Sequence, residues 1–476
     1  MALNIVIMAA GKGTRMKSAL PKVLHRLAGR PLLHHVLRAA ATLAPAQCLV
    51  VTGHGAELVE ASLQTGAEAA GLRAPLRCVR QEPQLGTGHA VAQALPSLAG
   101  DDDITLVLNG DVPLVRGETL AALVAACGGE RLALLAVELA DPTGYGRIVR
   151  SGSSSGGARG GHVLAVVEER DASEVQRAIR EVYTGILAAP TGWLRRWVAA
   201  LRNDNAQREY YLTDVVAEAV ADRVAVVTAH VADPTEVLGV NSASQLADLE
   251  RRWQRAQAEA LMDAGVRLAD PARFDLRGTL ECGHDVEIDV GCIFEGRVRI
   301  AEGAAIGAHC VLRDAEIGAF AVIHPYTHID GAEVGVGAIV GPYARLRPGA
   351  RLGADVHVGN FVEVKNASLA DGAKANHLSY LGDATVGERA NIGAGTITAN
   401  YDGARKHRTT IGADVHVGSN CVLVAPVTVG NGATVGGGST ITADVPPGKL
   451  AVARGRQVVI DGWQRPRKGD RAPAGG

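Results

Sequence analysis

A repeat of apolar side chains at every sixth position constrains this chain more than any other feature of its sequence. The repeat begins after Leu268. A sustained period of six is the pattern of a parallel β-helix, in which one apolar side chain per hexapeptide fills a narrow core. Glycine at 58 of 476 positions and an aromatic content of only 3% suit the tight corners and narrow core of such a coil. The expected core positions are Ile300, Ile306, Leu312, Ile323, Ile329, Val334, Val340, Leu346, Leu352, Val358, Val364, Val386, Ile392, Thr398, Ile411, Val417, Leu423, Val429, Val435 and Ile441.

Two stretches, Ala373–Thr385 and Ala399–Thr410, break this period. Insertions into a solenoid become loops, and loops carry function, so we expect both stretches to be loops beside a functional site. The first contains His377, and a histidine on such a loop can act as a general base near neutral pH. Taken alone, such a histidine is more often an ordinary surface residue.

The first 240 residues alternate apolar strands with helical stretches, which indicates βαβ units around a mainly parallel sheet. The low-complexity stretch Ser151–Gly161 is expected to be a surface hairpin loop. The predicted strands are Ile5–Ala9, Cys48–Thr52, Leu76–Val79, Ile104–Asn109 and Leu132–Val137, and the predicted helices are Pro31–Leu43, Ala56–Leu63, Thr87–Ala94 and Glu118–Cys127.

Residues 242–264 form a predicted connecting helix with apolar residues at 3–4 spacing. Ser242 and Gln245 make a capping box at its start, and Gly265 can end it. A chain of this length exceeds the roughly 250–300 residues at which a single core stops growing. We therefore expect an α/β domain over residues 1–240, a helical linker over 241–264 and a β-helix domain over 265–476.

Charge and cysteine usage argue against several classes of protein. The formal net charge of −2 gives no electrostatic case for binding nucleic acid or a membrane surface. The apolar run at the start of the sequence is too short to span a bilayer and leads into a glycine loop rather than a cleavage site. The seven cysteines are scattered without a C-x-x-C pair, which favours reduced thiols in a cytoplasmic protein.

Two segments of the first domain carry candidate phosphate and metal chemistry. The glycine loop Met8–Met16 lets backbone N–H groups approach phosphates, which Lys22 can neutralise. The loop lacks the Walker A pattern and the third glycine of a dinucleotide fingerprint. Asp111 follows an apolar strand, at the edge where sites of α/β sheets lie, and Mg²⁺ takes few protein oxygens. Read alone, both segments are also consistent with plain turns.

Further motifs are Q-E-P-Q-L-G-T-G-H-A from Gln81, N-G-D-V-P-L from Asn109, P-T-G-Y-G-R from Pro142 and G-V-N from Gly239. Together with G-x-G-T-R-M from Gly11, the following P-K and the hexapeptide repeat, they resemble one family over nearly the whole chain. It is the bacterial bifunctional N-acetylglucosamine-1-phosphate uridyltransferase/glucosamine-1-phosphate acetyltransferase family. The resemblance implies an α/β, Rossmann-like nucleotidyltransferase domain joined by a long helix to a left-handed parallel β-helix.

For the first domain, the resemblance implies that UTP and Mg²⁺ are bound, with Asp111 and Asn241 as the metal ligands. Asn109 stands where the family carries Tyr, and Tyr183 stands where Asn is usual, which leaves a shifted sugar preference open. The implied nucleotide- and sugar-binding positions are Met8, Ala9, Ala10, Gly11, Lys22, Gln81, Gly86, Thr87, Asn109, Gly110, Asp111, Gly146, Glu168, Tyr183 and Asn241. Among them, the uracil would be read by Gln81, Gly86 and Thr87.

For the second domain, the resemblance implies that His377 is the base that takes a proton from the glucosamine amine as it attacks acetyl-CoA. Gly437 stands where Ala is common, so only its backbone can contact a ligand. The implied sugar-phosphate positions are Arg347, Lys365, Tyr380, Asn391 and Lys406, and the implied acetyl-CoA positions are Ala394, Asn400, Tyr401, Ser419, Gly437 and Arg454.

The implied activity is acetylation of glucosamine 1-phosphate, then uridylyl transfer that yields UDP-N-acetylglucosamine and pyrophosphate, for peptidoglycan and lipopolysaccharide synthesis. The resemblance also implies a cytoplasmic homotrimer with small-molecule substrates and without nucleic-acid or membrane partners. Two alternatives stay open. One is a sugar-1-phosphate nucleotidyltransferase with a non-catalytic trimerising β-helix, against which His377 and Asn391 speak. The other is a non-catalytic sugar-nucleotide sensor, against which Lys22, Asp111 and Asn241 speak.

Overall fold

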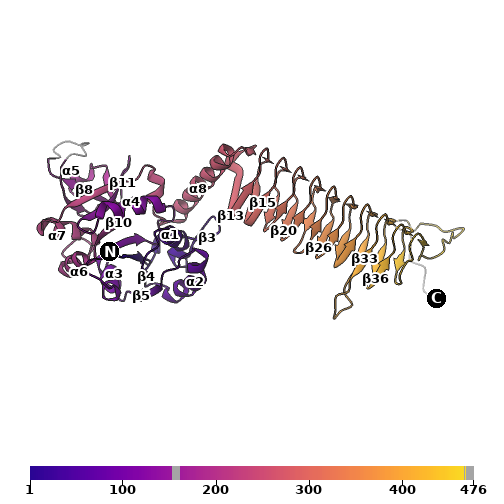
Figure 1. Cartoon of the computed structure of the whole chain (residues 1–476), viewed down its shortest axis with the longest axis horizontal. Helices are drawn as coiled ribbons and strands as arrows, with labels where there is room; N and C mark the ends of the chain where they lie inside the picture. The colour runs from indigo at the N-terminus through magenta and orange to yellow at the C-terminus, as the bar shows by residue number, and fades with distance from the viewer. Residues whose placement is uncertain (153–160, 466, 468–476) are drawn as a thin grey trace. The chain divides into compact units, whose positions relative to one another are not determined.

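The structure is a computed structural model that describes residues 1–152, 161–465 and 467. The chain divides into two compact units, Met1–Gln257 and Ala258–Gly476 (Figure 1). Each has its own sheets and is described by itself. In the part of the chain that the structure describes, no helix combines the length and the apolar character that a membrane crossing requires.

A nine-stranded sheet forms the centre of the first unit, with the main order β11-β7-β10-β6-β1-β4-β5. The strands β1, β4, β5 and β6 run parallel, so their carboxyl ends meet at one edge, whereas β10 runs antiparallel to β6 and β7. The hairpin of β8 and β9 pairs with β10. The strand bounds are β1 Leu3–Met8, β4 Gln47–Thr52, β5 Leu76–Arg80, β6 Ile104–Asn109, β7 Leu132–Glu138, β8 Gly146–Arg150, β9 Val163–Val167, β10 Glu181–Pro190 and β11 Val226–His230.

Helices cover both faces of this sheet and bury one apolar cluster on each (Figure 1). One cluster lies under α1, α2 and α4, and the other under α3, α6 and α7. The central strands β1, β4, β6, β7 and β10 are largely buried on both sides and therefore read as nearly continuous apolar runs. The helix bounds are α1 Leu32–Ala41, α2 Ala56–Ala69, α3 Thr87–Ala94, α4 Gly117–Cys127, α5 Glu174–Arg177, α6 Thr191–Ala200 and α7 Val215–Ala221.

The predicted strands and helices of the first 140 residues are confirmed, with small shifts at their ends. The sequence interpretation named no element between residues 138 and 241, where the structure has β8 to β11 and α5 to α7. The predicted hairpin loop Ser151–Gly161 falls largely on residues 153–160, which lie outside the described residues. The strands that flank it, β8 and β9, pair antiparallel.

The helix α8 (Ala243–Asp263) begins and ends close to its predicted limits. Ser242 Oγ accepts the Gln245 N–H at 3.2 Å, as in a capping box, but the Gln245 side chain accepts the N–H of Asn241 at 2.8 Å. In a complete capping box, the Gln245 side chain would accept the N–H of Ser242. Here it holds the backbone of Asn241, the preceding residue, instead. At the other end, Gly265 takes a φ of +93°, a conformation that glycine adopts without strain.

The second unit is a left-handed parallel β-helix built from two long ladders of short strands between β12 (Arg267–Leu268) and β39 (Leu450–Ala451). Each strand pairs in parallel with the strand one coil further along the chain. Every predicted core position is buried, which confirms the six-residue interpretation. Thr398 is the polar member of this set, and its hydroxyl exchanges hydrogen bonds of 2.8 and 3.0 Å with the backbone of Gly382.

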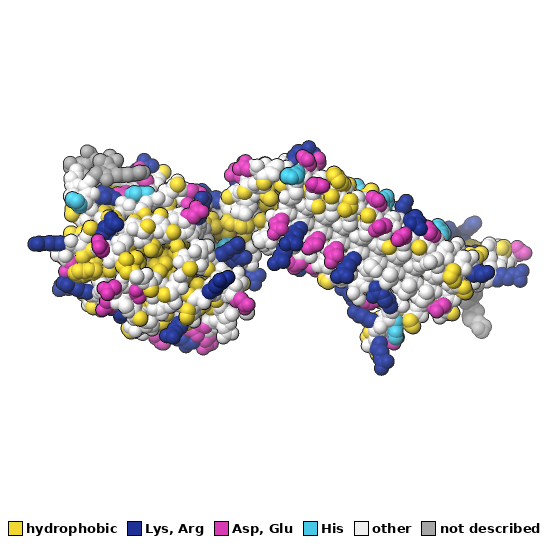
Figure 2. Space-filling model, viewed as in Figure 1, with side chains coloured by type: hydrophobic (Ala, Val, Ile, Leu, Met, Phe, Trp, Pro, Cys, Tyr) yellow, Lys and Arg dark blue, Asp and Glu magenta, His cyan; other side chains and the backbone are white. Residues whose placement is uncertain are grey.

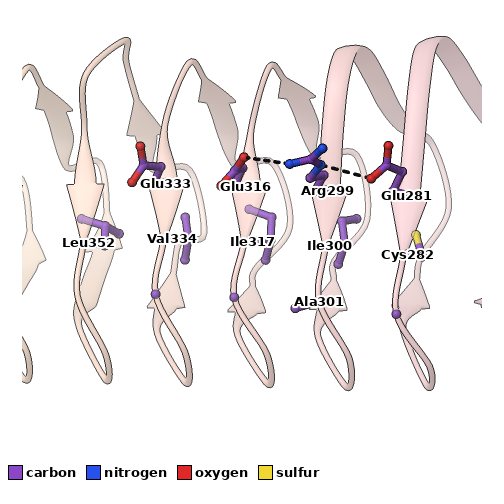
Figure 3. Close-up of a pocket in the computed structure, with 13 residues that line it drawn as sticks. Glu281, Cys282, Arg299, Ile300, Ala301, Glu316, Ile317, Glu333, Val334 and Leu352 are labelled. Atoms are coloured by element: carbon purple, nitrogen blue, oxygen red, sulfur yellow. Dashed lines mark hydrogen bonds and ion pairs between the residues drawn. The ribbon is translucent and has the colours of Figure 1, made fainter.

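Stacked coils place equivalent residues in rows along the outside of the second unit. Figure 2 shows Lys/Arg and Asp/Glu side chains alternating along one face of it. In the first coils, Arg299 lies between Glu281 and Glu316, with nitrogen–oxygen distances of 3.1 and 3.7 Å, beside an open groove (Figure 3). Opposite charges on neighbouring strands stabilise their pairing. The row beneath is apolar and belongs to the core.

The expectation of a loop at Ala373–Thr385 is wrong. The stretch forms strands β28 (Lys374–His377), β29 (Tyr380–Gly382) and β30 (Ala384–Val386), which stay in the ladders. The period seemed broken because small Ala375 and shifted Leu381 fill the core positions there, and both are fully buried. The second expected loop is present between β32 (Ile397–Ala399) and β33 (Thr409–Ile411). We call residues 400–408 the insertion loop, which projects from the coil before β33 (Figure 1).

Candidate active sites

Three polar side chains converge at the carboxyl edge of the sheet in the first unit. The Lys22 ammonium forms an ion pair with Asp111 and donates to Asn241 Oδ1 at 3.1 Å. Asp111 lies just beyond the end of β6, and the Lys22 and Asp111 side chains are 14% and 19% exposed. A carboxylate and an amide oxygen that meet one cation are also the donors that suit a magnesium ion.

Local backbone features fix this cluster. Gly13 has a φ of +58°, and a Cβ there would lie 2.8 Å from the Lys22 Cβ, so glycine is needed beside the lysine. The N–H of Val240 donates to the Asp111 carbonyl at 3.0 Å, which brings the start of α8 next to β6. The Gln245 side chain then holds the backbone of Asn241.

The predicted uracil-binding segment follows β5 on the same edge. Gln81 is buried, and its Nε2 donates to the Gly86 carbonyl at 2.9 Å. A Cβ on Gly86 would lie 2.6 Å from the Tyr210 carbonyl oxygen at a φ of +109°, which explains the glycine. Thr87 Oγ1 accepts the N–H of Leu212 at 3.0 Å. Ala10 is buried at the end of β1, whereas Gly11 beside it has open space where a side chain would be.

A pocket of about 190 Å³ lies between β6, β8 and β10 and contains the predicted sugar-binding positions. Burial raises the pKa of Glu168, and its Oε1 accepts the Thr213 hydroxyl at 3.2 Å. Asn109 Nδ2 donates to the Thr184 carbonyl at 3.1 Å. The lining residues are Met8, Thr87, Asn109, Gly144, Tyr145, Gly146, Glu168, Tyr183, Thr184, Gly185, Leu212 and Thr213.

The two positions that depart from the family pattern, Asn109 and Tyr183, both line this pocket. Tyr183 is 5% exposed, and its hydroxyl has no hydrogen-bond partner within the described ranges. Burial, with a smaller effect of the Glu168 carboxylate, raises the pKa of this phenol, so the hydroxyl stays protonated. The two unusual residues therefore lie at the same pocket.

In the second unit, a single corner column of the β-helix contains His377 and three of the six predicted acetyl-CoA positions. His377 ends β28 and is paired in register with Asn360 of the preceding coil, whose Oδ1 lies 2.9 Å from His377 Nδ1. Backbone hydrogen bonds between successive coils link this corner step by step down the column. Arg454 Nη1 donates to the Gly437 carbonyl at 2.7 Å. From coil to coil the column reads Asn360, His377, Ala394, Ser419 and Gly437.

The predicted phosphate-binding cations gather on the neighbouring face. The Lys406 ammonium, on the insertion loop, lowers the pKa of Lys365, which shows that the two side chains are close together. Arg347 lies one coil before Lys365 and donates to Glu363 Oε1 at 2.8 Å, a contact that raises the pKa of the guanidinium. Tyr380 is in register with Glu363. Like charges in contact favour an anionic ligand between them.

The remaining predicted positions lie farther along the coil. Asn391 contacts the His416 ring at 3.3 Å on the other ladder. Tyr401 is the second residue of the insertion loop, and its hydroxyl donates to the Gly403 carbonyl at 2.6 Å. Sequence reasoning missed Asn360 and Thr213. Asn360 precedes His377 by one coil, so the coil spacing itself could have identified it. Thr213 gives no sequence signal, because it reaches Glu168 only through the tertiary fold.

Comparison with known proteins gives matches over both units. Residues 5–211 match the family model of the MobA-like NTP transferase domain, and residues 408–443 match the bacterial transferase hexapeptide (six repeats). The chain is 71% identical over 466 residues to the bifunctional protein GlmU of Methylibium petroleiphilum, covering 98% of this chain and 99% of that protein. It is 65% identical over 479 residues to that of Acidovorax sp. (strain JS42) and 56% identical over 466 residues to that of Cupriavidus pinatubonensis, with the same coverage.

The proximity of Lys365 and Lys406 predicts a measurable titration. Replacing Lys406 by Gln removes a neighbouring positive charge, so the protonated form of Lys365 becomes more favourable and its pKa rises. Lysine side-chain NMR measures the pKa of Lys365. The titration covers pH 8–12, because an unperturbed lysine has a pKa of roughly 10.4. The control Lys374→Gln, on β28, leaves the Lys365 titration unchanged. An unaltered Lys365 pKa in Lys406→Gln would show that the two ammonium groups are apart.

Proposed function

Since the chain belongs to the family of the bifunctional GlmU proteins, we propose that its first unit carries uridylyl transfer and its second unit carries acetyl transfer. The protein is a bifunctional enzyme that acetylates glucosamine 1-phosphate and joins the product to the uridylyl group of UTP. The final products are UDP-N-acetylglucosamine, a precursor for peptidoglycan, and pyrophosphate. Its substrates are therefore small molecules, and we place the reactions in the cytoplasm.

One observation carries the assignment of uridylyl transfer: oxygens of Asp111 and Asn241 converge on the Lys22 ammonium. A site that already holds a cation between a carboxylate and an amide fits Mg²⁺, which Asp111 and Asn241 would hold and which would offset the negative charge of the phosphates. Lys22 then pairs with phosphate. An oxygen of the sugar phosphate attacks the α-phosphorus of UTP in line, the bond to the β-phosphate oxygen breaks, and pyrophosphate leaves.

The other residues of this edge bind and orient the two substrates. The backbone of Met8 to Gly11 faces the phosphates, because the space at Gly11 is open. Gln81, Gly86 and Thr87 hold the uracil. The sugar of N-acetylglucosamine 1-phosphate occupies the pocket lined by Asn109, Gly146, Glu168 and Tyr183, with Gly110 next to Asn109 in the chain. Holding both substrates in one geometry supplies much of the rate enhancement of phosphoryl transfer.

For acetyl transfer, His377 is the general base. Asn360 meets His377 Nδ1 through Oδ1, which is an acceptor, so Nδ1 carries the ring proton and Nε2 keeps its lone pair. Nε2 takes a proton from the amine of glucosamine 1-phosphate as the nitrogen attacks the thioester carbonyl. The carbon–sulfur bond then breaks, and the thiolate takes up a proton as coenzyme A leaves.

The cations beside this column bind the phosphate of the amino sugar. Arg347, Lys365 and Lys406 supply positive charge, with Tyr380 and Asn391 as further polar contacts of the sugar phosphate. Acetyl-CoA extends along the corner column from His377, so its reactive end meets the base. The acetyl-CoA contacts that we propose are Ala394, Asn400, Tyr401, Ser419, Gly437 and Arg454.

We also propose that the protein is a homotrimer. An exposed aromatic column, His309, Tyr326, Tyr343 and Phe361, stacks with ring centroids 5.0–5.5 Å apart. It lies at the same corner as His377, one residue further along each coil, and large exposed apolar rows mark interaction surfaces. A neighbouring subunit on this column would border the acetyl-transfer site, and threefold closure gives every subunit the same environment.

Sedimentation equilibrium of the full chain tests this assembly. We expect a species of about three times the 49.2 kDa chain mass. Replacing Tyr326 and Tyr343 by Ser removes the centre of the aromatic column and weakens association, whereas Tyr211→Phe, buried in the first unit, does not. A wild-type monomer that still acetylates glucosamine 1-phosphate would contradict the trimer.

The proposed metal site predicts that the variant Asp111→Asn makes N-acetylglucosamine 1-phosphate but does not consume it efficiently. This change keeps the size of the side chain and removes its charge, so uridylyl transfer falls by roughly a hundredfold or more, the scale for losing a preorganised electrostatic contact. Acetylation continues, and mass spectrometry detects accumulating N-acetylglucosamine 1-phosphate. Asp101→Asn, an exposed carboxylate of the same unit, serves as the control. Unchanged turnover of Asp111→Asn at saturating UTP and Mg²⁺ would remove the metal assignment.

The base assignment predicts the opposite pattern in His377→Ala. Thiol release from acetyl-CoA falls by about 10²–10⁴-fold, the usual contribution of a positioned base. Supplied N-acetylglucosamine 1-phosphate is still converted with UTP, because the first unit is intact. His357→Ala, on β25 (His357–Asn360), the strand that pairs with β28 in the same ladder, controls for loss of a surface histidine. Acetylation within about threefold of wild type would show that another group takes the proton.

A further inference from the structure

Asp383 is a buried carboxylate at the foot of the insertion loop. It is 7% exposed and occupies a corner with a φ of +48°, a conformation in which Asp is enriched. One carboxylate oxygen accepts the Asn366 amide and the other accepts the Asn400 amide. Burial of a carboxylate costs free energy unless its oxygens accept hydrogen bonds. The two amide bonds satisfy the oxygens of Asp383, and they link three successive coils.

The backbone of Asp383 makes two further contacts. Its N–H donates to the Lys365 carbonyl at 3.0 Å, and its carbonyl accepts the N–H of Thr409 at 3.2 Å. Asn400 and Thr409 flank the two ends of the insertion loop. One residue therefore touches the segment that carries Lys365 and both ends of the loop that carries Lys406.

This arrangement opposes a repulsion that the site itself creates. Lys365 and Lys406 are like charges in contact, and Arg347 adds to the positive potential at Lys365. Without an anionic ligand, this repulsion acts against the placement of the insertion loop beside the coil. Asp383 is the negative charge that acts on Lys365, and its two amide partners tie the loop end to the corner.

We propose that Asp383 is a positioning residue for acetyl transfer, which fixes the insertion loop so that Lys406 and Lys365 receive the phosphate of the amino sugar together. The inference rests on the proposed function of this site. Asp383 acts through Asn400 and the two lysines, so its loss weakens substrate binding more than it slows the proton transfer at His377.

The test compares Asp383→Asn with Asp314→Asn in the full chain. Asp314 occupies the same corner four coils earlier with a φ of +44°, and its carboxylate accepts the Arg297 N–H at 2.9 Å, far from the insertion loop along the β-helix. For Asp383→Asn, we expect KM for glucosamine 1-phosphate to rise roughly tenfold while kcat stays within about threefold, a scale that fits loss of one charge-assisted contact. Asp314→Asn leaves both values unchanged.

Limited trypsin digestion without substrate gives a second measurement. Arg405, Lys406 and Arg408 are cleavage sites in the loop, and we expect faster cleavage there in Asp383→Asn than in wild type or Asp314→Asn. Asn366→Gly, which removes one amide donor and tolerates the corner conformation, produces a smaller change in the same direction. This variant keeps the test decisive if Asp383→Asn folds poorly.

Two results would overturn the inference: an unchanged KM with unchanged cleavage, or a fall in kcat at constant KM. Acetylation by the wild-type chain is measured in the same series. Failure of the proposed function would appear as an inactive wild type, whereas failure of this inference would appear as an active variant that binds the amino sugar normally.

Discussion

Parallel pairing between successive coils determines how the second unit holds its chemistry. Each coil contributes short strands whose backbone bonds run to the next coil, while one apolar side chain per hexapeptide fills the core. Because every coil repeats the same path, residues one coil apart lie directly above one another. His377 therefore meets Asn360 although the two are 17 positions apart, and Ala394, Ser419 and Gly437 align along the same corner.

The first unit obtains the same convergence from a different constraint. Parallel strands end at one edge, so the loops that follow β1, β5 and β6 meet there although they are far apart in the sequence. The start of α8 joins them through the bond between Val240 and Asp111. Lys22, Asp111 and Asn241 come from three separate segments, and their contact depends on this edge rather than on any local motif.

The sequence could predict the repeating part of the molecule best. Six-residue periodicity identified the core of the β-helix because each apolar position there has one physical reason, burial in a narrow coil. It failed at Ala375 and Leu381, where the coil continues with a smaller or shifted core side chain. The sequence predicted a hairpin loop at Ser151–Gly161 but missed the strands β8, β9 and β10, because antiparallel strands added to a parallel sheet follow no βαβ spacing. Contacts such as Thr213 with Glu168 lie beyond sequence reasoning, since only the tertiary fold creates them.

The corner column also limits how proteins of this architecture can change in length. Coils of 17 and of 18 residues both keep the pairing, since His357 lies opposite both Ile339 and Lys374, so a corner absorbs one residue. A deletion inside β28 would instead shift His377 out of its row, and the base would lose its partner. Gain or loss of a complete turn of the solenoid keeps each row intact, and residues added to the insertion loop leave the ladder register untouched. Evolution of such chains is thus expected to change their length at corners, in whole turns and in the insertion loop, while the strands that carry site residues stay free of alignment gaps.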